Sequence, residues 1–321
     1  MNLELLLTNV TNPAFLFFIL GIIAVKLKSD LEIPANSSKF ISLYLLFSIG
    51  FKGGQELSHE TFNAEIVYSM LFGIVISLLI PVYTFFILKK KLNVYDAGAI
   101  AAAYGSVSAV TFVTAVAYLE AQKMQFQGHM VAIMALMESP AIIAGLLLIS
   151  VFNKEKNETT VSKTEVIRHS FTNGSVLLIL GSLLIGFLAN AKQAEGIKPF
   201  TNDIFKGFLA IFLLDMGIIS GKKLNSLSMY GLFPWVFAIV IPLINGIAVA
   251  WASQLVTHDV ANRFMFAVLA ASASYIAVPA AMKLAAPKSD PGLYIPMALA
   301  ITFPFNITFG MPVFLAVING V

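Results

Sequence analysis

The chain has 321 residues, of which 58% are hydrophobic and 12% are charged, with a net charge of +3 and no cysteine. Soluble globular domains are about half apolar and about a quarter charged, so this composition excludes one and predicts an integral membrane protein. The absence of cysteine excludes disulfides, thiolate metal sites and cysteine nucleophiles. The small net charge gives no reason to expect a nucleic-acid partner.

The apolar runs predict ten membrane-spanning helices, since a helix needs about 20 apolar residues to cross a bilayer. No basic residue precedes the first run in MNLELLLTNVTNP, so we expect no cleaved signal peptide. The expected fold class is therefore an all-α membrane protein. Its predicted spans are 13–28, 38–54, 65–88, 97–119, 128–152, 173–190, 203–221, 230–255, 260–282 and 293–319.

The basic residues predict the orientation of these spans. If the first span runs from outside to inside, fourteen lysines and arginines lie in or beside the cytoplasmic connections and six lie on the other side. The positive-inside rule then places both termini outside a cell inner (plasma) membrane. The longest polar connection, residues 153–172, becomes a cytoplasmic linker between the halves 1–152 and 173–321.

The two halves resemble each other in the order of their motifs. GFKGGQEL at 50–57 aligns with GIISGKKL at 217–224, and ESPAIIAG at 138–145 aligns with FPFNITFG at 303–310. Each half has an odd number of spans, so the second half enters the membrane upside down. We therefore expect a 5+5 inverted repeat.

Two polar interruptions occupy corresponding places in the fourth and ninth spans, YGSVSAV at 104–110 and ASASYIAVP at 271–279. Such interruptions predict broken helices 4 and 9, whose free N–H groups and positive ends suit a small anion. The alternative is that small residues here only let helices pack closely, with hydroxyls bonded to carbonyls. The candidate substrate-binding residues are Gly105, Ser106, Ser108, Thr111, Ser272, Ser274 and Tyr275.

Glu138 lies well inside a predicted span, where a carboxylate is costly unless it is paired or coordinated. With Ser139 and the carbonyl freed by Pro140 it would offer an oxygen site for Na⁺. The second half offers Thr302 and Asn306 at the equivalent place. Alternatives for Glu138 are a protonated structural acid or a proton carrier.

Asp215 is the other carboxylate inside a span. It lies outside the two serine-rich spans, so we expect it to cap a helix or to pair with Lys206 or Lys52 rather than to bind substrate.

No enzyme pattern is present. His59-Glu60 lacks the second histidine of a zinc helix, and neither Ser106 nor Ser108 has a histidine at a depth that could activate it. The four histidines have no ligand spacing. We therefore expect neither an enzyme nor a primary pump, with no cofactor and no metal beyond Na⁺ as a coupling ion.

Three segments resemble the sodium-dependent bicarbonate transporter family of cyanobacteria and other bacteria. They are YGSVSAVTFVTAVAYLE at 104–120, MALMESPAI at 134–142 and LAASASYIAVP at 269–279, and the likeness covers essentially the whole chain. The resemblance implies a gate domain from spans 1, 2, 6 and 7 and a core domain from spans 3–5 and 8–10. It further implies elevator-like movement of the core, a trimer, and in some members inhibition by a PII-like protein.

The resemblance also assigns residues. Gly105, Ser108 and Thr111 match the family's first serine motif, and Glu138 stands at its acidic position. Ser272, Ser274 and Pro279 match the second motif.

The chain departs from the family at five positions. An alanine and a valine replace a Gly-Ser pair, a tyrosine replaces an acid, and an alanine and a valine replace Ser-Gly: Ala109, Val110, Tyr275, Ala277 and Val278. The 5-to-6 connection is also shorter than the family's, which argues against PII-type control. We expect Na⁺-coupled symport of a small anion, with bicarbonate as the family's default. A different or organic anion is one alternative, and a channel or membrane sensor is another.

Overall fold

The computed structural model describes residues 13–153 and 174–320, and all the regular structure in these ranges is helical. The N-terminal residues 1–12 and residues 154–172 of the predicted linker lie outside the described residues. The helices of the first half are α2 (Pro13–Lys26), α3 (Ala35–His59), α4 (Ala64–Leu88), α5 (Val94–Gly105), α6 (Ala109–Ala121) and α7 (His129–Phe152).

The second half begins with α9 (Gly174–Leu188), α10 (Ala191–Lys198), α11 (Phe205–Leu227), α12 (Leu232–Ala252), α13 (Val260–Ala271) and α14 (Ala277–Ala285). The last predicted span consists of α15 (Pro291–Pro296), α16 (Phe303–Phe305) and α17 (Met311–Asn319), joined by the π-helical turns η4 (Met297–Thr302) and η5 (Asn306–Gly310). The π turns occur in a segment, Pro291–Asn319, that contains four prolines. A proline has no N–H and displaces the carbonyl of the preceding turn, which favours such departures from the α-helix.

Six helical segments are long and apolar enough to cross a membrane, judged by length and composition among the described residues. The protein is therefore a multi-pass membrane protein. Three further apolar helices are shorter: Leu16–Lys26, Leu177–Leu188 and Val260–Ala271. The six segments are Ala64–Leu88, Val94–Ala121, His129–Phe152, Ala191–Leu224, Leu232–Leu255 and Pro291–Asn319.

Both predicted helix breaks are confirmed. Helix α5 ends at Gly105 and α6 begins at Ala109, while α13 ends at Ala271 and α14 begins at Ala277. The first residue after each broken helix has nearly the same extended backbone, with φ −81° and ψ 177° at Ser106 and φ −80° and ψ 167° at Ser272. The Ser-rich sequence ends the helix in the same way at both places.

Four helices pack in two close pairs. Helix α2 packs along α11, where a side chain on Gly217 would overlap the backbone carbonyl of Phe18. Helix α3 packs along α9, where a side chain on Gly54 would overlap the carbonyl of Leu183. Glycine is required at these contacts because the backbones approach too closely for a Cβ atom.

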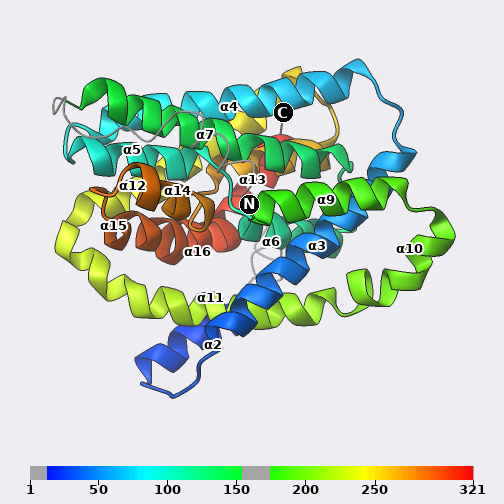
Figure 1. Ribbon diagram of the computed structural model, residues 1–321, viewed down its shortest axis with the longest axis horizontal. Helices are drawn as coiled ribbons and strands as arrows, with labels where there is room; N and C mark the ends of the chain where they lie inside the picture. Colours follow the sequence, from blue (N-terminus) through cyan, green and yellow to red (C-terminus); the bar gives the residue numbers. More distant parts are fainter. Residues whose placement is uncertain (1–12, 154–173, 321) are drawn as a thin grey trace.

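The remaining helices form two further groups around the breaks. Helix α4 packs against α5 and α7, and α12 packs against α13 and α17. Figure 1 shows α4, α5 and α7 on one side of the molecule and α2 and α11 on the opposite side. The last turns of α5 and α13 are buried on all sides, so both breaks lie in the interior.

Candidate functional site

The two serine-rich breaks contact each other directly. The backbone N–H of Ser274 donates to the carbonyl of Ala103 at 2.8 Å. On the other side, the N–H of Ser108 donates to the Ser272 hydroxyl at 3.0 Å, and this hydroxyl donates to the Leu269 carbonyl at 2.8 Å. The same sequence offset separates Ser108 from Ser274 and Ala103 from Leu269, so the two connections correspond. The two broken helices therefore meet at this crossing.

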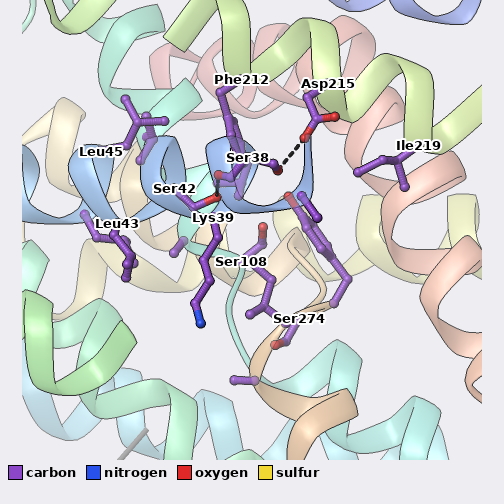
Figure 2. Close-up of a pocket in the computed structure, with 18 of the residues that line it drawn as sticks. Ser38, Lys39, Ser42, Leu43, Leu45, Ser108, Phe212, Asp215, Ile219 and Ser274 are labelled. Atoms are coloured by element: carbon purple, nitrogen blue, oxygen red, sulfur yellow. Dashed lines mark hydrogen bonds between the residues drawn. The ribbon is translucent and has the colours of Figure 1, made fainter. Parts of the chain in front are cut away.

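A cavity of about 640 Å³ lies beside this crossing. Three predicted substrate-binding residues, Ser108, Ser274 and Tyr275, line it. Figure 2 shows Ser108 and Ser274. The first turns of α6 and α14 reach the same cavity through Ala109 and Ala277. Since the first N–H groups of a helix have no partner within the helix, these two ends offer donors and positive dipole ends to an anion.

The other predicted substrate-binding residues make structural contacts and do not line the cavity: Gly105, Ser106, Thr111 and Ser272. The Ser106 hydroxyl donates to the Glu138 carbonyl at 3.5 Å, and the Thr111 N–H donates to the Ser108 hydroxyl at 3.1 Å. A side chain on Gly105 would overlap the ring of Pro81. The Ser272 hydroxyl accepts the Ser108 N–H across the crossing and donates to the Leu269 carbonyl of its own helix.

Glu138 is buried on α7 and lines the cavity. Its Oε1 atom has no hydrogen-bond partner among the described residues. A buried carboxylate without a partner is costly, and a cation or a proton removes most of that cost. Ser139 beside it is also buried.

Asn306 contacts the second break, whereas Thr302 contacts α12 and the end of α5. The Asn306 amide donates to the Ala271 carbonyl at 2.7 Å, and its Oδ1 atom has no partner among the described residues. The Thr302 hydroxyl donates to the Ala238 carbonyl at 2.7 Å and lies 2.8 Å from the Tyr104 hydroxyl. Neither Asn306 nor Thr302 lines the cavity. Of the candidate cation ligands, Glu138 therefore lines the cavity, whereas Asn306 contacts the second break without lining it.

The expectation that Asp215 pairs with Lys52 or Lys206 is wrong. Both lysines pair with Glu120 on α6, at 3.0 Å and 3.4 Å. Asp215 accepts a hydrogen bond from the Ser38 hydroxyl of α3 and lines the cavity (Figure 2). The reason is that the middle of α11 faces the start of α3, whereas Lys206 lies more than two turns away.

Sequence reasoning also missed the contribution of α3 to the cavity. Ser38, Lys39 and Ser42 line it, as does Lys222 of α11. Ser38 and Ser42 are four residues apart and share one helix face, which gives a polar stripe at the start of an apolar helix. This polar stripe is the sequence feature that could have predicted that α3 lines the cavity. Of the departures from the family, Ala109, Val110, Tyr275 and Ala277 line the cavity and Val278 does not.

Comparison with known proteins agrees with these features. A family model described as the Na⁺-dependent bicarbonate transporter superfamily matches residues 13–319, nearly the whole chain. No curated protein matches the chain.

Proposed function

Because the chain belongs to the Na⁺-dependent bicarbonate transporter superfamily, we propose that it is a secondary active transporter that carries a small anion, bicarbonate by family default, together with Na⁺. The family is one of transporters and not of enzymes. The observation that carries the proposal is the contact between the two broken helices beside a cavity that also receives Glu138.

The anion would bind at the first turns of α6 and α14. Ser108, Ser274 and Tyr275 would donate hydroxyl bonds, and the helix ends would supply N–H groups and positive potential. These donors lie in a low-dielectric surrounding, where a charge-assisted bond is stronger than in water.

The cation would bind at Glu138 and Ser139, since a free carboxylate oxygen in the interior is a ligand that Na⁺ accepts. The Oδ1 atom of Asn306, which has no partner among the described residues, would form a second place at the other break. An anion and a cation bound at neighbouring places attract each other, so each raises the affinity of the other by the same factor.

Helix packing supports a ten-span 5+5 inverted repeat. The first span packs on the seventh and the second on the sixth, an exchange that an internal twofold axis would produce. The corresponding connections at the crossing, through Ser274 and through Ser108, support the same symmetry. We assign α2, α3, α9 and α11 to a gate domain and the other spans to a core domain.

The cavity lies between α3 and α11 on one side and the crossing on the other, which fits an elevator in which the core moves along the gate. Lys39 and Lys222 line it, and the positive-inside rule assigns both to the cytoplasmic side. The cavity would therefore be the inward-open form of the site. We also propose that both termini lie outside an inner membrane and that the protein forms a trimer. The short linker at 153–172 argues against a PII-like regulator.

The lining of the cavity favours a second candidate substrate. Val107, Val110 and Ile276 present apolar surface beside the serines. Such a wall contacts a hydrocarbon group better than it contacts bicarbonate, so a small organic carboxylate carried by the same mechanism is the alternative.

Uptake of labelled bicarbonate into proteoliposomes tests the proposal. We expect uptake above equilibrium when an inward Na⁺ gradient is imposed, and saturation with substrate. Labelled acetate and propionate, tested in parallel, distinguish the second candidate. Uptake of every anion at a rate indifferent to Na⁺ would contradict Na⁺ coupling, and flux without saturation would indicate a channel.

A further inference from the structure

Asp215 places a second carboxylate in the wall of the anion cavity. It is buried in the middle of α11, and the Ser38 hydroxyl donates to it from the first turns of α3. Figure 2 shows this bond on the α3–α11 side of the cavity, with Ser108 and Ser274 on the other side.

No ion pair among the described residues explains a negative charge at Asp215. Among the described residues, no lysine or arginine lies within ion-pair distance of Asp215. The two lysines expected there, Lys52 and Lys206, pair with Glu120 instead. Lys222 acts on it only at longer range. An asparagine could accept the same bond from Ser38 without the cost of burying a carboxylate. The charge itself therefore needs a role.

The helix ends across the cavity leave a selectivity problem. Their positive potential attracts any small anion, and it attracts a dianion about twice as strongly as a monoanion. Carbonate and sulfate would therefore compete well against a singly charged substrate. A fixed negative charge on the opposite wall weakens this preference, since its repulsion also doubles with the charge of the anion.

We propose that Asp215 lowers the affinity of the cavity for doubly charged anions relative to singly charged ones and hastens the release of the bound anion. This inference rests on the proposed function, in which α11 belongs to the gate and the anion meets Asp215 only when the site opens inward. The other charged groups that line the cavity are Glu32, Lys39, Glu138 and Lys222. Of these groups, Lys39 and Lys222 are cations, so they attract anions and cannot supply the repulsion that Asp215 supplies.

The test compares a monoanion with a dianion. Thermal stabilisation of the purified protein is titrated with sodium formate and with sodium sulfate at constant Na⁺ and ionic strength. In Asp215→Asn we expect the affinity for sulfate relative to formate to rise about fivefold, as the loss of one unit charge a few ångströms away predicts. Asp215→Glu keeps the charge and should keep the wild-type ratio. Glu195→Gln removes an exposed carboxylate of α10, remote from the cavity lining, and is the matched control.

Transport gives the second readout. In Asp215→Asn, sulfate should inhibit bicarbonate uptake at lower concentrations than in wild type, and bound anion should leave more slowly in counterflow. An unchanged sulfate-to-formate ratio would overturn the inference while leaving wild-type uptake, and so the proposed function, intact. Loss of Na⁺ dependence in Asp215→Asn would make Asp215 a cation ligand instead. If Asp215→Asn raises the sulfate-to-formate ratio as expected but the wild type transports no anion, the proposed function fails, and only the effect of Asp215 on anion binding remains.

Discussion

Replacing Glu120 with glutamine should shift the protein towards the outward-open form. Glu120 is near the C-terminal end of α6, and Ser108 caps the other end of the same helix. Its carboxylate pairs with Lys52 of α3 at 3.0 Å and with Lys206 of α11 at 3.4 Å. In the proposed elevator these pairs join the core to the gate, so they must break when α6 moves.

The size of the shift follows from the exposure of the three side chains. Lys52 and Glu120 are 32% and 30% exposed, and Lys206 is 71% exposed. Ion pairs this accessible contribute about 0.2–1 kcal/mol each. Loss of both pairs at about 0.5 kcal/mol each changes the conformational equilibrium by about 1 kcal/mol, which is about fivefold.

The natural absence of cysteine makes the assay simple, because one introduced cysteine is the only thiol. Gln125 lines a second cavity of about 230 Å³ that also contacts Lys52 and Glu120. A membrane-impermeant maleimide should label Gln125→Cys about fivefold faster when Glu120→Gln is present, since labelling tracks the population of the rarer form. Leu43→Cys in the large cavity should be labelled no faster than before.

The matched control is Glu195→Gln, which breaks the 3.5 Å pair with Lys198 inside α10 and crosses no domain boundary. It should leave both labelling rates unchanged. Equal rates at Gln125→Cys with and without Glu120→Gln would refute the reasoning, as would faster labelling of Leu43→Cys.

Three further predictions concern single contacts. Glu138→Gln should abolish the dependence of bicarbonate uptake on Na⁺ while the fold survives, measured by uptake and by circular dichroism; retained Na⁺ dependence would exclude Glu138 as a cation ligand. Gly217→Ala should lower the free energy of unfolding by about 1–3 kcal/mol, because the added methyl group overpacks against α2. Gly207→Ala on the same helix meets open space, so it should change the melting temperature little. Val110→Ser with Ala277→Ser should tighten bicarbonate binding severalfold in calorimetry, because both side chains line the cavity; weaker binding would favour the organic carboxylate.

The helix breaks could be predicted because their causes are local. Serine competes for backbone hydrogen bonds, and the pairs Ser106 with Ser108 and Ser272 with Ser274 interrupt apolar runs at matching places. The predicted break ranges therefore agree with the ends of α5 and α13. The shared order of motifs in the two halves is also readable in the sequence, and the proposed inverted repeat would bring the two breaks together.

The ion pairs and the cavity could not be predicted because they depend on which helix faces meet. Nothing local to Glu120 indicates that lysines from two distant helices approach it. In the same way, the orientation of α11 against α3 decides that Asp215 meets Ser38 and not Lys206. Of the candidate cation ligands, Asn306 contacts Ala271 at the second break, whereas Glu138 lines the cavity.

The central claim is that the paired helix ends and Glu138 hold an anion and Na⁺ in the same cavity and couple their binding. Calorimetric titration of the purified protein with bicarbonate, at several Na⁺ concentrations and constant ionic strength, measures this coupling most directly. We predict that bicarbonate affinity rises with Na⁺, that Na⁺ affinity rises with bicarbonate by the same factor, and that both effects vanish in Glu138→Gln. Bicarbonate affinity that is the same at every Na⁺ concentration in the wild-type protein would contradict the claim.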